Sequence, residues 1–226
     1  MTDSNAINPL PSVRVLVEKG LQYIKNKEYV LAYKCFLVAA GQGDAEAQYR
    51  LATCCYMGRG TEQNYESAAS LYLRSAEQGY APAQNIIGIL YTKGKGVKRS
   101  YEESVKWFLR AAEQGNACAC KNLGEAFFTG TGVERDYEEA VKWYRKAAEG
   151  GDAEAQYNLG RCYQYGYGVE ADENEAAAWF AKAATDTPRH SAAPAASGLR
   201  EKGIDFSKKR KQQGMCTLSF IERQTL

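Results

Sequence analysis

The strongest constraint on the fold is that several kinds of residue return every 36 positions along the chain. Glycine pairs of the form G-x-G keep this step at Gly58-x-Gly60, Gly94-x-Gly96, Gly130-x-Gly132 and Gly166-x-Gly168. Four other columns keep it too: Gly43, Gly79, Gly115, Gly151; Tyr29, Tyr65, Tyr101, Tyr137; Ala47, Ala83, Ala119, Ala155; and Leu51, Ile87, Leu123, Leu159. A period of this length, held without slippage over four copies, predicts a protein built of stacked repeats.

Each repeat unit predicts two helices. Ala155, Leu159 and Tyr163 fall four apart and so share one helical face, after which a glycine pair interrupts the pattern. A second apolar face with three- and four-residue spacing follows each glycine pair. Gly151 followed by Asp152 is typical of a helix end and the N-cap of the next helix. We therefore expect an all-α fold of antiparallel helix pairs, with units at residues 44–79, 80–115, 116–151 and 152–187.

The glycine pairs admit a second interpretation, because a glycine loop that opens a helix can bind phosphate. No copy ends in the G-K-[ST] of a P-loop, and no strand–helix–strand pattern surrounds any copy. Glycine also permits a positive φ, which a turn between two helices requires. The pairs thus predict interhelical turns rather than nucleotide sites.

A column of large residues has the same period. Trp107, Trp143 and Trp179 keep the step, and Leu71 and Cys35 hold the equivalent earlier positions. A position that accepts tryptophan, leucine and cysteine is typical of a packed core, and a cofactor site is the weaker interpretation.

The units resemble Sel1-like repeats, which are related to tetratricopeptide repeats. The residues that carry the resemblance are AEAQYNLG at Ala153–Gly160, GYGV at Gly166–Val169 and A-x-x-W-Y-x-K-A-A at Ala140–Ala148. Two positions depart from the pattern: Ser104 stands in an alanine column and Glu173 in the tyrosine column. The resemblance implies a right-handed α-solenoid.

The segments that flank the four units are interpreted separately. Gly20-x-x-Tyr23 and Ala32-x-x-x-Phe36 resemble tetratricopeptide spacing, so residues 12–43 predict a further helix pair after a disordered stretch at 1–11. Residues 188–226 predict a C-terminal capping helix, in which Leu199, Ile204 and Phe206 would cover the last repeat, and a basic tail.

Composition argues against several classes of protein. The chain shows no secretory signal and no apolar run long enough to span a membrane, so we expect a cytoplasmic protein. Its seven cysteines form no C-x-x-C pair and it has one histidine, His190, so we expect no metal site and no cofactor. Reduced and mostly buried thiols are expected instead.

Candidate catalytic groups are few. Glu138 and Glu139 fall at the start of a predicted helix, where carboxylates complement the helix dipole. Cys118 and Cys120 lie two apart on a helix and so point in different directions. His190 lies in the irregular tail. We therefore predict no catalytic residue and no enzyme activity.

The remaining candidate site is the concave face of the solenoid. By resemblance to tetratricopeptide repeats, its residues lie two before, two after and five after the Leu51 column. They vary between copies while the core columns do not. The predicted partner-binding residues are Tyr49, Thr53, Tyr56, Asn85, Ile89, Lys121, Glu125, Phe128, Tyr157 and Arg161. Tyr49, Ile89, Phe128 and Tyr157 would be apolar anchors; the alternative is that they fill gaps between neighbouring repeats.

These observations favour a monomeric, non-catalytic adaptor or scaffold that binds a protein or peptide in the concave groove. One alternative is a β-lactamase-like hydrolase, as in cysteine-rich Sel1-like proteins, although this chain lacks their regular cysteine pair in each repeat. Another is a binder of nucleic acid or anionic membrane that acts through the basic cluster Lys208, Lys209, Arg210 and Lys211. Nucleic acid is not the expected ligand, because no aromatic residues alternate with these cations.

Overall fold

The computed structural model describes residues 12–186, which form ten α-helices and no strand. The expected disordered N-terminus, the C-terminal cap, the basic tail, His190 and Cys216 all lie outside the described residues. The helices are α1 (Val13–Lys25), α2 (Tyr29–Gly41), α3 (Ala45–Met57), α4 (Tyr65–Glu77), α5 (Ala81–Lys93), α6 (Tyr101–Glu113), α7 (Ala117–Thr129), α8 (Tyr137–Glu149), α9 (Ala153–Tyr165) and α10 (Glu173–Asp186).

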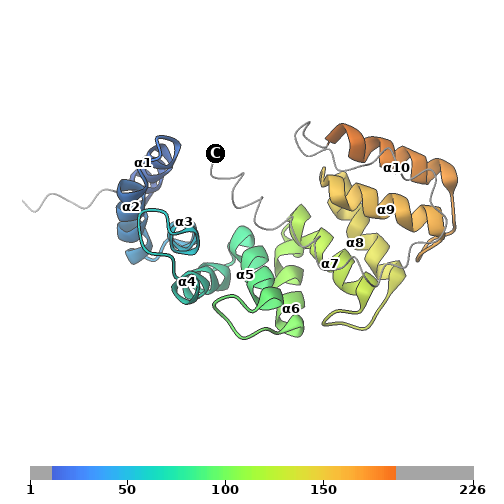
Figure 1. The fold of residues 1–226 in the computed structure, drawn as a ribbon, viewed down its shortest axis with the longest axis horizontal. Coiled ribbons are helices and arrows are strands. Elements are labelled where there is room, and N and C mark those ends of the chain that lie inside the picture. Colours follow the sequence, from blue (N-terminus) through green and yellow to red (C-terminus); the bar gives the residue numbers. More distant parts are fainter. Residues whose placement is uncertain (1–11, 187–226) are drawn as a thin grey trace, which may run out of the picture.

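Consecutive helices form antiparallel pairs, and each pair packs on the next one along the chain. Figure 1 shows the pairs following one another along an arc, with α3, α5 and α7 on its inner side and α4, α6 and α8 on its outer side. The expected all-α solenoid of antiparallel helix pairs is confirmed.

The N-terminal pair α1–α2 is closed by a turn shorter than the glycine loops. Lys27 has a φ of 63°, the one positive value at a non-glycine position among residues 12–186. Gly20 on α1 lies directly against the ring of Phe36 on α2, where an added methyl group would be 2.8 Å from the Cζ atom of that ring. Glycine at this position therefore lets the two helices approach closely.

A glycine with positive φ, followed by an N-cap residue, separates most of the predicted repeats. Gly151 has a φ of 84°, and the carboxylate of Asp152 accepts a hydrogen bond from the backbone N–H of Ala155 at 2.8 Å. Asp44 and Asn116 cap α3 and α7 in the same way. Each cap satisfies one of the backbone donors that a helix start leaves without a partner.

The glycine pairs are turns, as predicted, and they also join one repeat to the next. All eight glycines have positive φ, between 66° and 77°. The second glycine of each pair lies against the first residue of the preceding repeat's outer helix, so that an added Cβ would overlap the carbonyl oxygen of that residue. The contacting pairs are Gly60 with Tyr29, Gly96 with Tyr65, Gly132 with Tyr101 and Gly168 with Tyr137. The tyrosine column ends at Glu173, and no G-x-G follows that position in the sequence.

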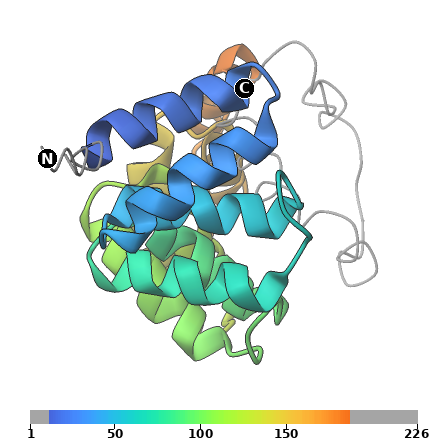
Figure 2. The ribbon, with the colours of Figure 1, turned by 90° about the vertical axis from the view of Figure 1, so that its left-hand side faces the viewer.

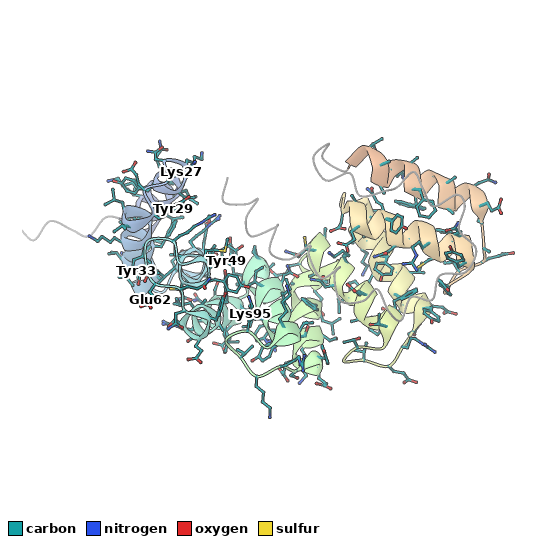
Figure 3. The ribbon with its side chains drawn as sticks, in the orientation of Figure 1. Lys27, Tyr29, Tyr33, Tyr49, Glu62 and Lys95 are labelled. Atoms are coloured by element: carbon teal, nitrogen blue, oxygen red, sulfur yellow. The ribbon has the colours of Figure 1, made fainter. Side chains whose placement is uncertain are left out.

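The residue between the two glycines lies over the same tyrosine in three of the four loops. The guanidinium of Arg59 is 5.3 Å from the ring centre of Tyr29, and the ammonium of Lys95 is 4.5 Å from that of Tyr65. In the last loop the Tyr167 ring takes this place, 5.4 Å from Tyr137. Figure 3 labels Tyr29 on α2 and Lys95 after α5. These three loops thereby contact the repeat before them through cation–π or ring contacts.

The residue columns predicted to form the core are buried. Ala47, Ala83, Ala119 and Ala155 are inaccessible to solvent, and the three tryptophans are buried, whereas Leu71 and Cys35 in the same column are half-buried. The ammonium of Lys146 lies 4.0 Å from the ring centre of Trp143 and covers it from one turn away. One buried cluster runs from α3 to α10, and a second cluster joins α1 and α2 to α3, so the core is shared between repeats rather than confined to each one.

Candidate functional site

The predicted site residues that precede the Leu51 column by two positions have two different environments. Tyr49, Asn85 and Lys121 are buried, whereas Tyr157 is 43% exposed. All four occupy the same place on α3, α5, α7 and α9. The difference therefore comes from what lies next to each helix.

The three buried members of this column each contact the following repeat. The ring of Tyr49 is 5.3 Å from that of Tyr80. The side-chain oxygen of Asn85 accepts a hydrogen bond from Asn122 at 3.0 Å, and Lys121 Nζ donates to Glu154 Oε2 at 2.8 Å. These side chains fill the gaps between repeats, which was the alternative interpretation of the column. The expectation that Tyr49 is an exposed anchor is wrong.

The other two columns are also largely buried toward the N-terminal end. Thr53 Oγ1 donates to the carbonyl oxygen of Tyr49 at 3.0 Å, and Ile89 is buried, so neither side chain is open to a partner. Tyr56 is buried against Tyr65, with 5.0 Å between ring centres. An exposed role is therefore wrong for Thr53, Ile89 and Tyr56, as it is for buried Asn85 and Lys121.

Phe128 has an intermediate position. Its ring is half-buried and lies edge-on to Tyr137 at 5.0 Å and to Tyr167 at 5.4 Å. It belongs to the aromatic cluster beneath the last glycine loop. Its role in the structure is to join the third and fourth repeats.

Solvent-accessible polar and aromatic side chains gather on α7 and α9. Glu125 and Tyr157 are exposed, and Arg161 is half-buried. Two residues that the sequence did not predict lie with them: Asn122, which is half-buried, and Glu154, whose side chain is 46% exposed. We call this set the α7–α9 surface: Asn122, Glu125, Glu154, Tyr157 and Arg161.

The charges of the α7–α9 surface surround a buried phenol. Burial raises the pKa of Tyr144 well above its ordinary value, the nearby carboxylates of Glu125 and Glu154 raise it further, and the Arg161 guanidinium lowers it. The Tyr157 ring packs on Phe180 at 5.4 Å. The surface therefore offers a positioned aromatic ring together with two carboxylates and a guanidinium. Such groups can bind the polar, charged and aromatic side chains of another protein.

Two of the buried cysteines are less acidic than an ordinary thiol. Burial raises the pKa of Cys54 to about 12 and that of Cys162 to about 11, so both remain protonated thiols at neutral pH. Within residues 12–186, no group of three or more histidine, cysteine, aspartate or glutamate side chains is placed to hold a metal ion. Cys118 is half-buried and Cys120 is buried on α7.

The ion pair between repeats leads to a stability prediction. Glu154→Gln is expected to lower the free energy of unfolding by about 1–3 kcal/mol, because the buried ammonium of Lys121 loses an anionic partner. Glu46→Gln is the matched control, since Glu46 holds the same column but pairs with Arg50 on its own helix. The control should cost about 0.2–0.5 kcal/mol. Urea unfolding followed by circular dichroism measures both variants, and equal losses would contradict the prediction.

No helix within residues 12–186 has both the length and the apolar character that crossing a bilayer requires.

Comparison with known proteins is consistent with this geometry. The Sel1 repeat family model matches five segments, at residues 16–44, 45–80, 81–116, 119–152 and 153–186. The first of these covers the N-terminal pair, whose spacing resembles that of tetratricopeptide repeats. A search of curated protein sequences finds no match to this chain.

Several solved structures share the fold. A Sel1 repeat protein from Oxalobacter formigenes is 34% identical with a TM-score of 0.74, over 77% of this chain and 71% of that one. A protective antigen from uropathogenic Escherichia coli, described as having an SLR fold, is 32% identical with a TM-score of 0.73, over 76% of this chain and 38% of that one. An immunity protein from Pseudomonas aeruginosa, 20% identical with a TM-score of 0.52 over 78% of this chain and 66% of that one, shares the fold alone. From the five matched repeats and the helix-pair architecture, this chain belongs to the Sel1 repeat family.

Proposed function

We propose that this protein is a non-catalytic adaptor or scaffold that binds a protein or peptide partner through the α7–α9 surface. The observation that carries the proposal is the exposure of Tyr157, which stands in a column whose other members are buried between repeats. A large ring held in place by Phe180 and bordered by charged groups has the character of an interface anchor.

The rest of the molecule supports a binding role. Each helix pair is fixed to its neighbours by a glycine loop and by a shared core, so the α7–α9 surface is presented on a rigid frame. A rigid surface loses little conformational entropy when a partner binds. The Sel1 repeat fold is consistent with protein–protein interaction.

The protonated state of the buried thiols supports the non-catalytic part of the proposal. A cysteine nucleophile needs a lowered pKa, and burial shifts Cys54 and Cys162 in the opposite direction. Thiols packed in the core also suit a reducing compartment, so we propose that this protein acts in the cytoplasm. We also propose that it acts as a monomer.

The test is site-specific crosslinking in the source cell with a photoreactive phenylalanine analogue at position 157. Position 101 is the matched control, because Tyr101 is a comparably exposed tyrosine on the outer row, at the start of α6. We expect one partner to crosslink from position 157 and not from position 101. Crosslinking of the same protein from both positions would contradict the proposal.

A binding measurement with the identified partner follows. Tyr157→Ala/Arg161→Ala is expected to weaken its affinity at least about tenfold, the loss of roughly one hot-spot contact. Tyr101→Ala/Arg99→Ala removes a tyrosine and its covering arginine elsewhere and should leave the affinity unchanged. Circular dichroism checks that both variants keep their helices. Equal affinities for the two variants would remove the α7–α9 surface from the proposal.

A further inference from the structure

Helix α2 differs from the other outer helices because Lys34 is its one charged residue and its outward face is otherwise apolar. Its sequence is YVLAYKCFLVAAG, and its inward face buries Ala32, Phe36, Ala39 and Ala40. Its outward face nevertheless exposes four large aliphatic side chains: Val30 at 55%, Leu31 at 41%, Leu37 at 47% and Val38 at 41%. A helix that is hydrophobic all round is normally covered all round.

The same positions in later repeats show that the fold does not require an apolar outer face. Val30 is replaced one, two and three steps later by Glu66, Glu102 and Glu138. Val38 is replaced by Arg74, Arg110 and Lys146. At these two positions the outer faces of α4, α6 and α8 are thus charged where that of α2 is aliphatic. An exposed aliphatic cluster at such a place indicates an interaction surface.

The cluster has a defined shape. Val30, Lys34 and Val38 are four residues apart and form one straight row, about 12 Å long, with Leu31 and Leu37 on its two sides. We call these five residues the α2 patch. Figure 2 looks onto the N-terminal end of the arc and shows α1 and α2 in front, with no other described helix over them.

The α2 patch has a positive charge at its centre, and two further lysines lie next to one of its ends. Lys34 stands in the middle of the aliphatic row, and Lys25 and Lys27 lie at the turn that leads into α2. Figure 3 shows Lys27, Tyr29 and Tyr33 following one another along this pair. The acidic residue at the turn, Glu28, accepts a hydrogen bond from Asn26 at 3.0 Å.

We propose that the α2 patch binds an amphipathic helix of a partner protein whose apolar face carries one Asp or Glu. A row of residues four apart is the ridge that fits the groove of another helix. Covering the row would bury Lys34, and a buried ammonium needs a carboxylate partner. A second copy of this chain fits poorly, because two-fold pairing would place the lysine-centred patches against each other.

This site is separate from the α7–α9 surface, since it lies on the outer row of helices at the opposite end of the arc. It therefore does not depend on the proposed function, and loss of binding at one site leaves the other testable.

The test uses two synthetic helical peptides that share a leucine face and differ at its centre, where one carries Glu and the other Gln. Isothermal titration calorimetry with the full chain should show the Glu peptide binding at least about tenfold more tightly. Lys34→Gln should abolish this difference. Lys106→Gln, which changes the same column on α6, should preserve it. Val30→Glu/Val38→Glu should eliminate binding of both peptides while the circular dichroism spectrum is unchanged.

Three results would overturn the proposal. The first is equal affinity for the Glu and Gln peptides, or no affinity for either. The second is a dimer in sedimentation velocity that Val30→Glu/Val38→Glu converts to monomer, which would assign the α2 patch to a second copy. The third is flotation with vesicles of phosphatidylcholine and phosphatidylglycerol that the same variant abolishes, which would assign the patch to an anionic membrane.

Discussion

Gly132→Ala is expected to lower the free energy of unfolding by about 2–5 kcal/mol. The backbone of Gly132 has a φ of 77°, and alanine in that region costs about 1–2 kcal/mol. The new Cβ would also overlap the carbonyl oxygen of Tyr101 and lie 2.5 Å from its carbonyl carbon. Because these atoms belong to the backbone, the loop must move away from the preceding repeat, and the contact between the two repeats weakens.

Gly115→Ala is the control that separates the cost of a positive φ from the cost of the overlap with the preceding repeat. Gly115 has a φ of 81°, close to that of Gly132, but nothing lies within 4 Å of its added Cβ. This control should lose only about 1–2 kcal/mol. Urea unfolding followed by circular dichroism and by tryptophan fluorescence measures both variants. Equal losses would show that the glycine–tyrosine contact does not hold the repeats together.

Trp143→Ala is expected to cost about 3–5 kcal/mol, because it removes a buried ring and leaves a cavity. It also removes the surface that Lys146 covers at 4.0 Å. The loss should appear as a lower urea midpoint, and the repeats on either side of α8 should unfold in the same step, since the core is continuous through them.

Trp143→Phe is the informative comparison. The indole Nε1 of Trp143 is buried and makes no hydrogen bond within the described structure. Phenylalanine removes that donor along with part of the ring, so the two effects oppose each other. We expect a loss below about 1.5 kcal/mol. A loss as large as that of Trp143→Ala would contradict this expectation.

The sequence was sufficient to predict the repeats and their helix pairs because the signals involved are local. A positive φ at Gly151 and an N-cap at Asp152 depend on residues within one turn of each other. Three of the four units repeat both signals, with Asp44, Asn116 and Asp152 as N-caps, and the unit that starts at Tyr80 keeps only the glycine. The burial of the tryptophan column could be predicted for the same reason.

The contact between glycine loop and tyrosine could not be predicted, although both columns were visible. Gly132 and Tyr101 meet because one repeat stacks on the next at a particular distance and rotation. The period of the sequence gives the number of residues in a unit, but it does not give the rotation and translation that relate one unit to the next. The Glu173 departure in the tyrosine column was a sign of this contact, since it falls where no further G-x-G follows.

The site was predicted least well, and two identical segments show why. The sequence DAEAQY occurs at Asp44–Tyr49 and again at Asp152–Tyr157, and in both copies it caps and begins an inner helix. The local sequence determined those caps and helices, because hydrogen bonds within one turn require nothing else. Yet Tyr49 is 3% exposed and Tyr157 is 43% exposed. Only the tertiary structure decided that difference, because exposure depends on which side chains of the neighbouring repeat, such as Tyr80, cover the ring.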